Sequence, residues 1–146
     1  MENSNSSVEK VKKIKLDFKD SKYATGRRKR SIAKVWIKKG NGNIHVNGIK
    51  MNEYFKRPVH QIIVTWPLEI TQVSSNYDVK CSVKGGGLSG QAGAIILGIS
   101  KALIAHDENL KKNLKKDKLT TRDSRVVERK KYGHRKARRS FQFSKR

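Results

Sequence analysis

The segment YDVKCSVK at residues 77–84 leads through GGGLSG at residues 85–90 into QAGAIILGISKALIAH at residues 91–106. In the first part, apolar residues alternate with polar ones, which is typical of a strand with one face buried and one face in water. Cys81 therefore belongs to the predicted core. In the last part, apolar residues recur at helical spacing, which predicts a helix that packs one side on the sheet. A strand, a glycine loop and a helix in this order indicate the α+β class.

The chain upstream of this segment contains a second alternating stretch at residues 32–38. It ends at Gly-Asn-Gly, residues 40–42, and residues 43–46 read as a returning strand, so the pattern predicts a hairpin. Residues 51–65 are predicted to form short helical pieces that stop before Pro67, because proline lacks the backbone N–H that a helix interior needs.

The charge of the chain is strongly positive and unevenly placed. Lys and Arg number 35 against 12 Asp and Glu, giving a formal net charge of +23 in 146 residues. Residues 41–110 are nearly neutral, whereas residues 23–40 carry 7 basic and no acidic side chains, and residues 111–146 carry 16 and 3. Such a chain repels itself and seeks a polyanion, which points to nucleic acid.

Other compositional features exclude several classes of protein. The single cysteine, Cys81, rules out an internal disulfide and a multi-thiolate zinc site, and it favours a reducing compartment. The four histidines are too far apart for a local metal motif, so we expect no metal and no cofactor. The longest apolar-biased run, residues 92–105, is interrupted by Gly, Ser and Lys, so no membrane association is expected.

Three segments are expected along the chain. Residues 1–22 are polar and charged with few apolar residues, which predicts a disordered N-terminal extension. Residues 23–130 are expected to form a globular RNA-binding body. Residues 131–146 lack hydrophobic periodicity and are expected to form an extended basic C-terminal tail.

A run of four cations, Arg27-Arg28-Lys29-Arg30, follows Gly26. A bent backbone here could bring several charges onto one phosphate path, and we favour direct contact with RNA. The alternatives are a solvated basic loop and a localisation signal, since charge runs of this kind are common in both.

The glycine loop lies between the predicted strand and helix, so its free amides and the helix dipole would favour an anion at residues 87–91. A nucleotide loop is a competing interpretation, but the Gly-Lys-Ser/Thr ending of a P-loop is absent. The loop also somewhat resembles the phosphate loop of small-metabolite kinases, which need a far longer chain. Contact with an RNA phosphate, or plain packing of strand on helix, is favoured over nucleotide chemistry.

The C-terminal residues interleave cations with Tyr132, Phe141 and Phe143. Charge tracks phosphates and rings can stack on exposed bases, a combination found in RNA-binding extensions. A solvated tail is the alternative. Trp36 and Trp66 are interpreted as core or rim residues in preference to stacking platforms.

Several motifs occur together and in order, and they identify a family resemblance. They are YATGRRK at 23–29, VNG at 46–48, PL at 67–68, VKGGGLSGQA at 83–92, TRD at 121–123 and QFSKR at 142–146. Over roughly residues 23–146 the chain closely resembles ribosomal protein nine of the small subunit, bacterial type.

The resemblance implies a fold and a function. The fold would be two-layered, with a mixed sheet of about four strands, helices on one face, a left-handed β-α-β crossover and a long extended C-terminal tail. The function would be that of a non-enzymatic structural constituent of the small-subunit head, on bacterial cytoplasmic ribosomes or, alternatively, mitochondrial or other organellar ones. The implied partners are small-subunit ribosomal RNA, peptidyl-site tRNA and neighbouring head proteins.

The expected site residues combine this resemblance with the basic and glycine-rich stretches. For ribosomal RNA they are Arg27, Arg28, Lys29, Arg30, Lys84, Gly86, Gly87, Ser89, Gln91, Arg122, Arg125, Arg129, Lys130, Lys131, Tyr132, Arg135, Lys136, Arg138 and Arg139. For the anticodon stem-loop of the peptidyl-site tRNA the resemblance implies Ser144, Lys145 and Arg146. The Arg146 fork can pair bidentately with a phosphate, whereas Lys145 offers a point charge.

The chain departs from the family pattern at Thr120, Ser124 and Phe141, the last two standing where the family usually has proline. Because Phe141 adds a stackable ring at a bend, we hypothesise that it contacts a nucleotide or another protein. Two other functions compete with the ribosomal one: a small phosphotransferase that uses residues 85–90, and a free RNA chaperone outside the ribosome.

Overall fold

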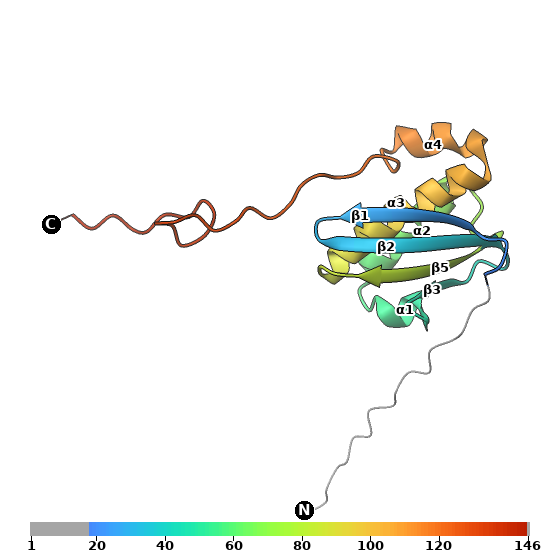
Figure 1. Cartoon of the computed structure of the whole chain (residues 1–146), viewed down its shortest axis with the longest axis horizontal. Coiled ribbons are helices and arrows are strands. Elements are labelled where there is room, and N and C mark those ends of the chain that lie inside the picture. The colour runs from blue at the N-terminus through green and yellow to red at the C-terminus, as the bar shows by residue number, and fades with distance from the viewer. Residues whose placement is uncertain (1–17, 146) are drawn as a thin grey trace, which may run out of the picture.

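The sheet has five strands in the order β1-β2-β5-β3-β4 in the computed structural model, which describes residues 18–145 (Figure 1). Their bounds are β1 Lys22–Arg28, β2 Ser31–Lys39, β3 Ile44–Val46, β4 Ile49–Lys50 and β5 Tyr77–Lys84. β3 and β5 run parallel, whereas the other neighbouring pairs are antiparallel. The α+β class and the mixed sheet are confirmed, and the sheet has five strands where about four were expected.

The helices cover one face of this sheet. Their bounds are α1 Met51–Tyr54, α2 Pro58–Ile70, α3 Leu88–His106, the 3₁₀ turn η1 Glu108–Leu110, and α4 Lys111–Lys116. α3 packs on β1 and β2, and α2 packs on α3 (Figure 1). α3 is long and apolar enough to cross a membrane, but 67% of its apolar window is buried inside the protein, as in the core helix of a two-layer fold.

The core lies between the two layers, where alternate residues of β2 and β5 meet α3. Val35 and Val79 are fully buried, and Cys81 is 1% exposed, as the alternating pattern predicts. Burial raises the pKa of the Cys81 thiol, because an apolar environment disfavours the thiolate. The strand at Tyr77–Lys84 and the helix that ends at His106 are therefore confirmed.

The predicted hairpin between the second strand and residues 43–46 is wrong, because β5 lies between β2 and β3. The loop after β2 crosses the start of β5, where the Asp78 carboxylate accepts the N–H groups of Asn41 at 3.0 Å and Asn43 at 2.8 Å. Past β3, the Asn47 side chain donates to the Val83 carbonyl and accepts its N–H. These bonds hold β3 beside β5, and sequence spacing carries no sign of them.

The predicted helix stop before Pro67 is also wrong, since α2 continues through Pro67 to Ile70. Val64, Pro67 and Leu68 are buried together on the inner side of α2. Burying these side chains outweighs the single backbone hydrogen bond that proline removes. Thr71 closes the helix, with its hydroxyl donating to the Pro67 carbonyl at 2.8 Å.

β1 and α3 approach each other so closely that only glycine fits between them. A Cβ atom on Gly26 would collide with the Ala94 carbonyl oxygen and lie 2.5 Å from the Gly98 nitrogen. Because successive strand residues face opposite ways, Arg28 lies on the helix side with Gly26, while Arg27 lies on the other side. The close approach brings the end of β1 beside the start of α3.

The C-terminal segment carries no helix or strand from Thr121 to Lys145, apart from an isolated bridge between His134 and Ser140. It runs away from the body, drawn in orange to red in Figure 1. Most of the predicted N-terminal extension, residues 1–17, and the predicted tRNA-binding Arg146 lie outside the described residues.

Candidate nucleic-acid interface

The four-cation run forms the end of the β1–β2 hairpin. Arg28 pairs with Ser31, which leaves a two-residue turn made of Lys29 and Arg30. Lys29 has a φ of +51°, a conformation that sequence rules expect of Gly or Asn. The sequence therefore shows the cations but not the turn, and the structure places Lys29 and Arg30 at the exposed tip.

The glycine loop packs against this turn. Gly85 and Gly86 have φ values of +77° and +61°, and a Cβ on Gly85 would lie 2.5 Å from the Arg30 carbonyl oxygen. The Ser31 hydroxyl donates to the Gly85 carbonyl at 3.0 Å. Gly87 differs, because no other atom lies within 4 Å of where its Cβ would be. The first two glycines thus serve packing, and the third leaves the start of α3 open.

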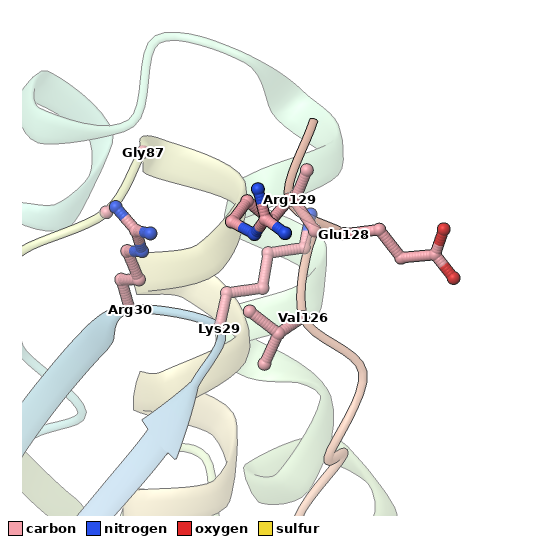
Figure 2. Close-up of a pocket in the computed structure, with 8 residues that line it drawn as sticks. Lys29, Arg30, Gly87, Val126, Glu128 and Arg129 are labelled. Atoms are coloured by element: carbon pink, nitrogen blue, oxygen red, sulfur yellow. The ribbon is translucent and has the colours of Figure 1, made fainter. Parts of the chain in front are cut away.

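A surface pocket of about 410 Å³ joins three segments that are distant in the sequence. Its lining comprises the turn residues Lys29 and Arg30, the loop residues Gly86 and Gly87, and Val126, Val127, Glu128 and Arg129 from the C-terminal segment. Figure 2 shows Lys29, Arg30 and Arg129 around it, with the Glu128 carboxylate pointing away. Three cations beside an open helix start form a surface suited to phosphate groups.

Arg28 takes a different role from its neighbours. Its side chain lies along α3 where Gly93 leaves room, and its Nη2 is 3.4 Å from Oδ2 of Asp123. Arg125 donates to the same carboxylate from Nε at 3.0 Å and from Nη2 at 2.8 Å. The hydrogen bonds from Arg125 and, to a smaller extent, the charge of Arg28 hold the pKa of Asp123 well below its usual range. Asp123 therefore ties the start of the C-terminal segment to the body.

Lys29 and Arg30 have no such acidic partner. Within residues 18–145, neither lies within 4.0 Å of a carboxylate, in contrast to Arg28, Arg125 and Arg138. Their charges are thus not neutralised by the described part of the chain, which favours binding to an external anion.

The C-terminal segment folds back on itself once. Arg138 donates to Glu128 from Nε at 2.9 Å and from Nη2 at 2.7 Å, which lowers the pKa of the Glu128 carboxyl. The Arg135 guanidinium lies 5.5 Å from the centre of the Phe141 ring, a cation–π arrangement. The Tyr132 ring is fully exposed. The loop closed by Glu128 thus presents cations and a free ring together.

Comparison with known families adds an independent finding: the family model of ribosomal protein S9/S16 matches residues 26–146. The chain belongs to this family. Ribosomal proteins of the S9/S16 family are structural and bind the RNA of the small subunit, so this chain has ribosomal RNA as a partner. The match begins at Gly26 and so includes every residue of the pocket.

The expected S9/S16-family site residues are only partly brought together. Lys29, Arg30, Gly86, Gly87 and Arg129 meet at the pocket. Gln91 is used internally, since its side chain donates to the Gly85 carbonyl at 3.2 Å and accepts from the Tyr54 hydroxyl at 2.7 Å. The others lie elsewhere: Arg27 and Lys84 on the sheet face away from the helices, Ser89 in the first turn of α3, and Arg122, Lys130, Lys131, Tyr132, Arg135, Lys136, Arg138, Arg139, Ser144 and Lys145 along the C-terminal segment.

Sequence reasoning missed the part that Asp123, Val126 and Val127 play in this S9/S16-family protein. The two valines line the pocket although they are 55% and 80% exposed. The TRD motif at residues 121–123 was the one sequence signal for a structural role of Asp123. The motif does not show that its partners are Arg28 and Arg125.

Replacing Asp123 with Asn should loosen the attachment of the C-terminal segment without unfolding the body. Arg28 and Arg125 would lose their shared carboxylate, so hydrogen exchange of the Arg125 amide, which donates to Asp123 Oδ1 at 3.0 Å, should rise a few-fold while β5 and α3 stay protected. The pKa of Asp123 is lower in the folded protein than in the unfolded chain. Its stabilisation of the attachment is therefore complete above the ordinary carboxyl pKa, and it is lost as the pH falls from there through the depressed pKa. Unchanged exchange in the variant at pH 7 would contradict the anchoring role.

Proposed function

We propose that this S9/S16-family protein sits in the head of the small subunit, with the pocket at Lys29, Arg30 and Arg129 as its main contact with ribosomal RNA phosphates. The observation that carries this proposal is the convergence of unneutralised cations from two separate segments beside the open start of α3. Phosphate contacts of this kind set affinity and orientation without reading sequence, as suits a structural component.

The packing of the glycine loop argues against the phosphotransferase alternative. Gly85 and Gly86 face the hairpin turn, so they are not free to cradle a nucleotide. The free-chaperone alternative predicts that the protein leaves the small-subunit peak when subunits sediment at moderate salt. Retention in that peak at ~0.2 M salt supports the structural role.

The C-terminal tail is proposed to reach the tRNA in the peptidyl site. Fully extended, residues 131–146 would span up to ~55 Å at ~3.3–3.6 Å per residue. This reach requires the loop closed by Glu128 and Arg138 to open. The Phe143 ring is 86% exposed, and Ser144 and Lys145 follow it on the surface. The exposed, basic end of the segment supports contact with a second phosphate backbone, beyond the one that holds the body.

Removing Lys145 and Arg146 should weaken peptidyl-site tRNA binding by roughly five- to tenfold at ~0.1 M salt, because two phosphate partners are removed. The measurement is tRNA retention on purified small subunits that carry the truncated protein. A matched loss of charge, Lys111→Gln with Lys112→Gln on α4, should leave tRNA affinity unchanged. Normal tRNA occupancy and initiation fidelity in the truncated subunits would rule out the tail role.

Three further features are proposed on the strength of family membership. The parallel β3–β5 crossover through α1 and α2 is proposed to be left-handed, contrary to the general rule. The chain is proposed to comprise an extension at 1–22, a body at 23–130 and a tail at 131–146. Its ribosome is proposed to be cytoplasmic and bacterial or, alternatively, mitochondrial or of another organelle, with other head proteins as neighbours.

A further inference from the structure

The sheet face opposite the helices carries no helix in the described part of the chain, and we call it the open face; the Phe18 ring lies beside Lys80 on it. It consists of the residues of β1, β2 and β5 that alternate with the buried core positions. Its cations are Arg27, Lys34, Lys38, Lys80 and Lys84. The single acid among these alternating positions, Asp78, is already engaged by the N–H groups of the preceding loop. The open face is thus strongly positive, and three of its five cations come from the basic stretch at residues 23–40.

Aromatic rings lie at the centre of the open face. The Tyr23 and Trp36 rings are 5.3 Å apart between centres and tilted by 42°, and Tyr23 is 48% exposed. The Lys80 ammonium lies 5.8 Å from the centre of the Trp36 ring and 5.7 Å from that of Phe18. Trp36 is partly exposed and lies outside the core. The centre of the open face therefore combines ring surface with cations.

We propose that the open face binds unpaired nucleotides of the small-subunit RNA, with a base stacked on Tyr23 and Trp36 and with Lys34 and Arg27 on the adjoining phosphates. Stacking on a ring suits any base, and cations beside the ring suit the backbone. Four cations apart from Lys80, namely Arg27, Lys34, Lys38 and Lys84, lie on this face against one engaged acid, which favours a polyanion over an ordinary protein surface. This inference rests on the proposed function, because it assumes the same RNA partner.

The open face is continuous with the pocket, which strengthens the inference. Arg27 pairs across the hairpin with Ile32, which in turn lies opposite Lys84. Arg27 thus directly precedes Arg28, whose side chain pairs with Asp123, and Lys84 immediately precedes the glycine loop. An RNA held at the pocket can therefore continue across the end of the sheet onto the open face.

Tryptophan fluorescence can test the inference directly, because the chain has two tryptophans on different layers. Trp66→Phe leaves Trp36 on the open face, and Trp36→Phe leaves Trp66, which is 45% exposed on α2. Each full-length variant is titrated with an RNA fragment of the small-subunit head at ~0.1 M salt, and binding is followed separately by filter retention. The Trp36 emission should be quenched with the same Kd as retention, and the Trp66 emission should not change.

The outcomes separate the two proposals. Retention of RNA with unchanged Trp36 emission would overturn the open-face inference and leave the pocket intact. A Trp36 that acrylamide cannot reach in the free protein would also overturn it, because the face would then be covered by the chain itself. Failure of the RNA to bind at all would overturn the proposed function and this inference with it.

Substitutions on the open face give a second test. Tyr23→Val keeps a residue that favours strands, and it should weaken RNA binding about tenfold, as expected for the loss of one stacked base. Lys34→Gln should lower the slope of log affinity against log salt by about one, as expected for the loss of one phosphate contact. Lys101→Gln on the exposed side of α3 should leave this slope unchanged.

Binding within twofold of the parent in Tyr23→Val would count against the inference. So would a photo-crosslinker at residue 34 that joins a neighbouring protein, and not RNA, in the assembled subunit.

Discussion

Reversing both turn charges, Lys29→Glu together with Arg30→Glu, should weaken binding to small-subunit ribosomal RNA by roughly 100-fold at ~0.1 M salt. The two side chains form the tip of the β1–β2 hairpin and line the pocket with Arg129. The described residues offer them no carboxylate within 4.0 Å, so the change removes two external phosphate contacts and adds repulsion. Stability should change little, because both side chains are exposed.

The salt dependence of binding distinguishes this effect from misfolding. The slope of log affinity against log salt should fall by about two or more, because the variant neutralises that many fewer phosphates. The matched control is Lys111→Glu with Lys112→Glu, which makes the same charge change in the first turn of α4. If that control weakens binding as much as the turn variant, the pocket has no special role and only net charge matters.

Replacing Gly26 with Ala should lower the free energy of unfolding by about 3 kcal/mol or more, and the melting temperature by more than about 10 °C. The added methyl group would meet the backbone of Ala94 and Gly98, neither of which can move without shifting α3. The same shift would separate the hairpin from the helix start, so RNA affinity should fall along with stability. Thermal unfolding followed by circular dichroism measures the first effect.

Gly87→Ser provides the matched control for stability. No atom lies within 4 Å of where the new Cβ would be, and serine is favoured at a helix N-cap. The unfolding free energy of this variant should stay within about 0.5 kcal/mol of the parent. A Gly26→Ala variant as stable as this control would show that β1 and α3 can separate at little cost.

Much of the fold follows from local patterns. The alternation over Tyr77–Lys84 and the helical spacing up to His106 correspond to β5 and α3, because each pattern has a single periodicity and a clear apolar face. The sequence did not predict β1, because Gly26 and the cations interrupt the alternation of apolar and polar residues that is typical of a strand. The pairing of β3 beside β5 depends on the Asn47 side chain and on the loop across Asp78, which join residues about 36 positions apart.

The candidate site, like the fold, was predicted from the sequence only in part. The sequence by itself determined the nucleic-acid partner, because an excess of cations at the two ends of a neutral middle is visible in composition and ordered motifs. Only the tertiary structure decided which cations act together. Lys29, Arg30 and Arg129 converge, while Arg28 and Arg125 are tied to Asp123 and Arg27 lies on the open face. The physical reason is that strand alternation and chain reversal set the direction of each charge, and neither is encoded in the order of the cations alone.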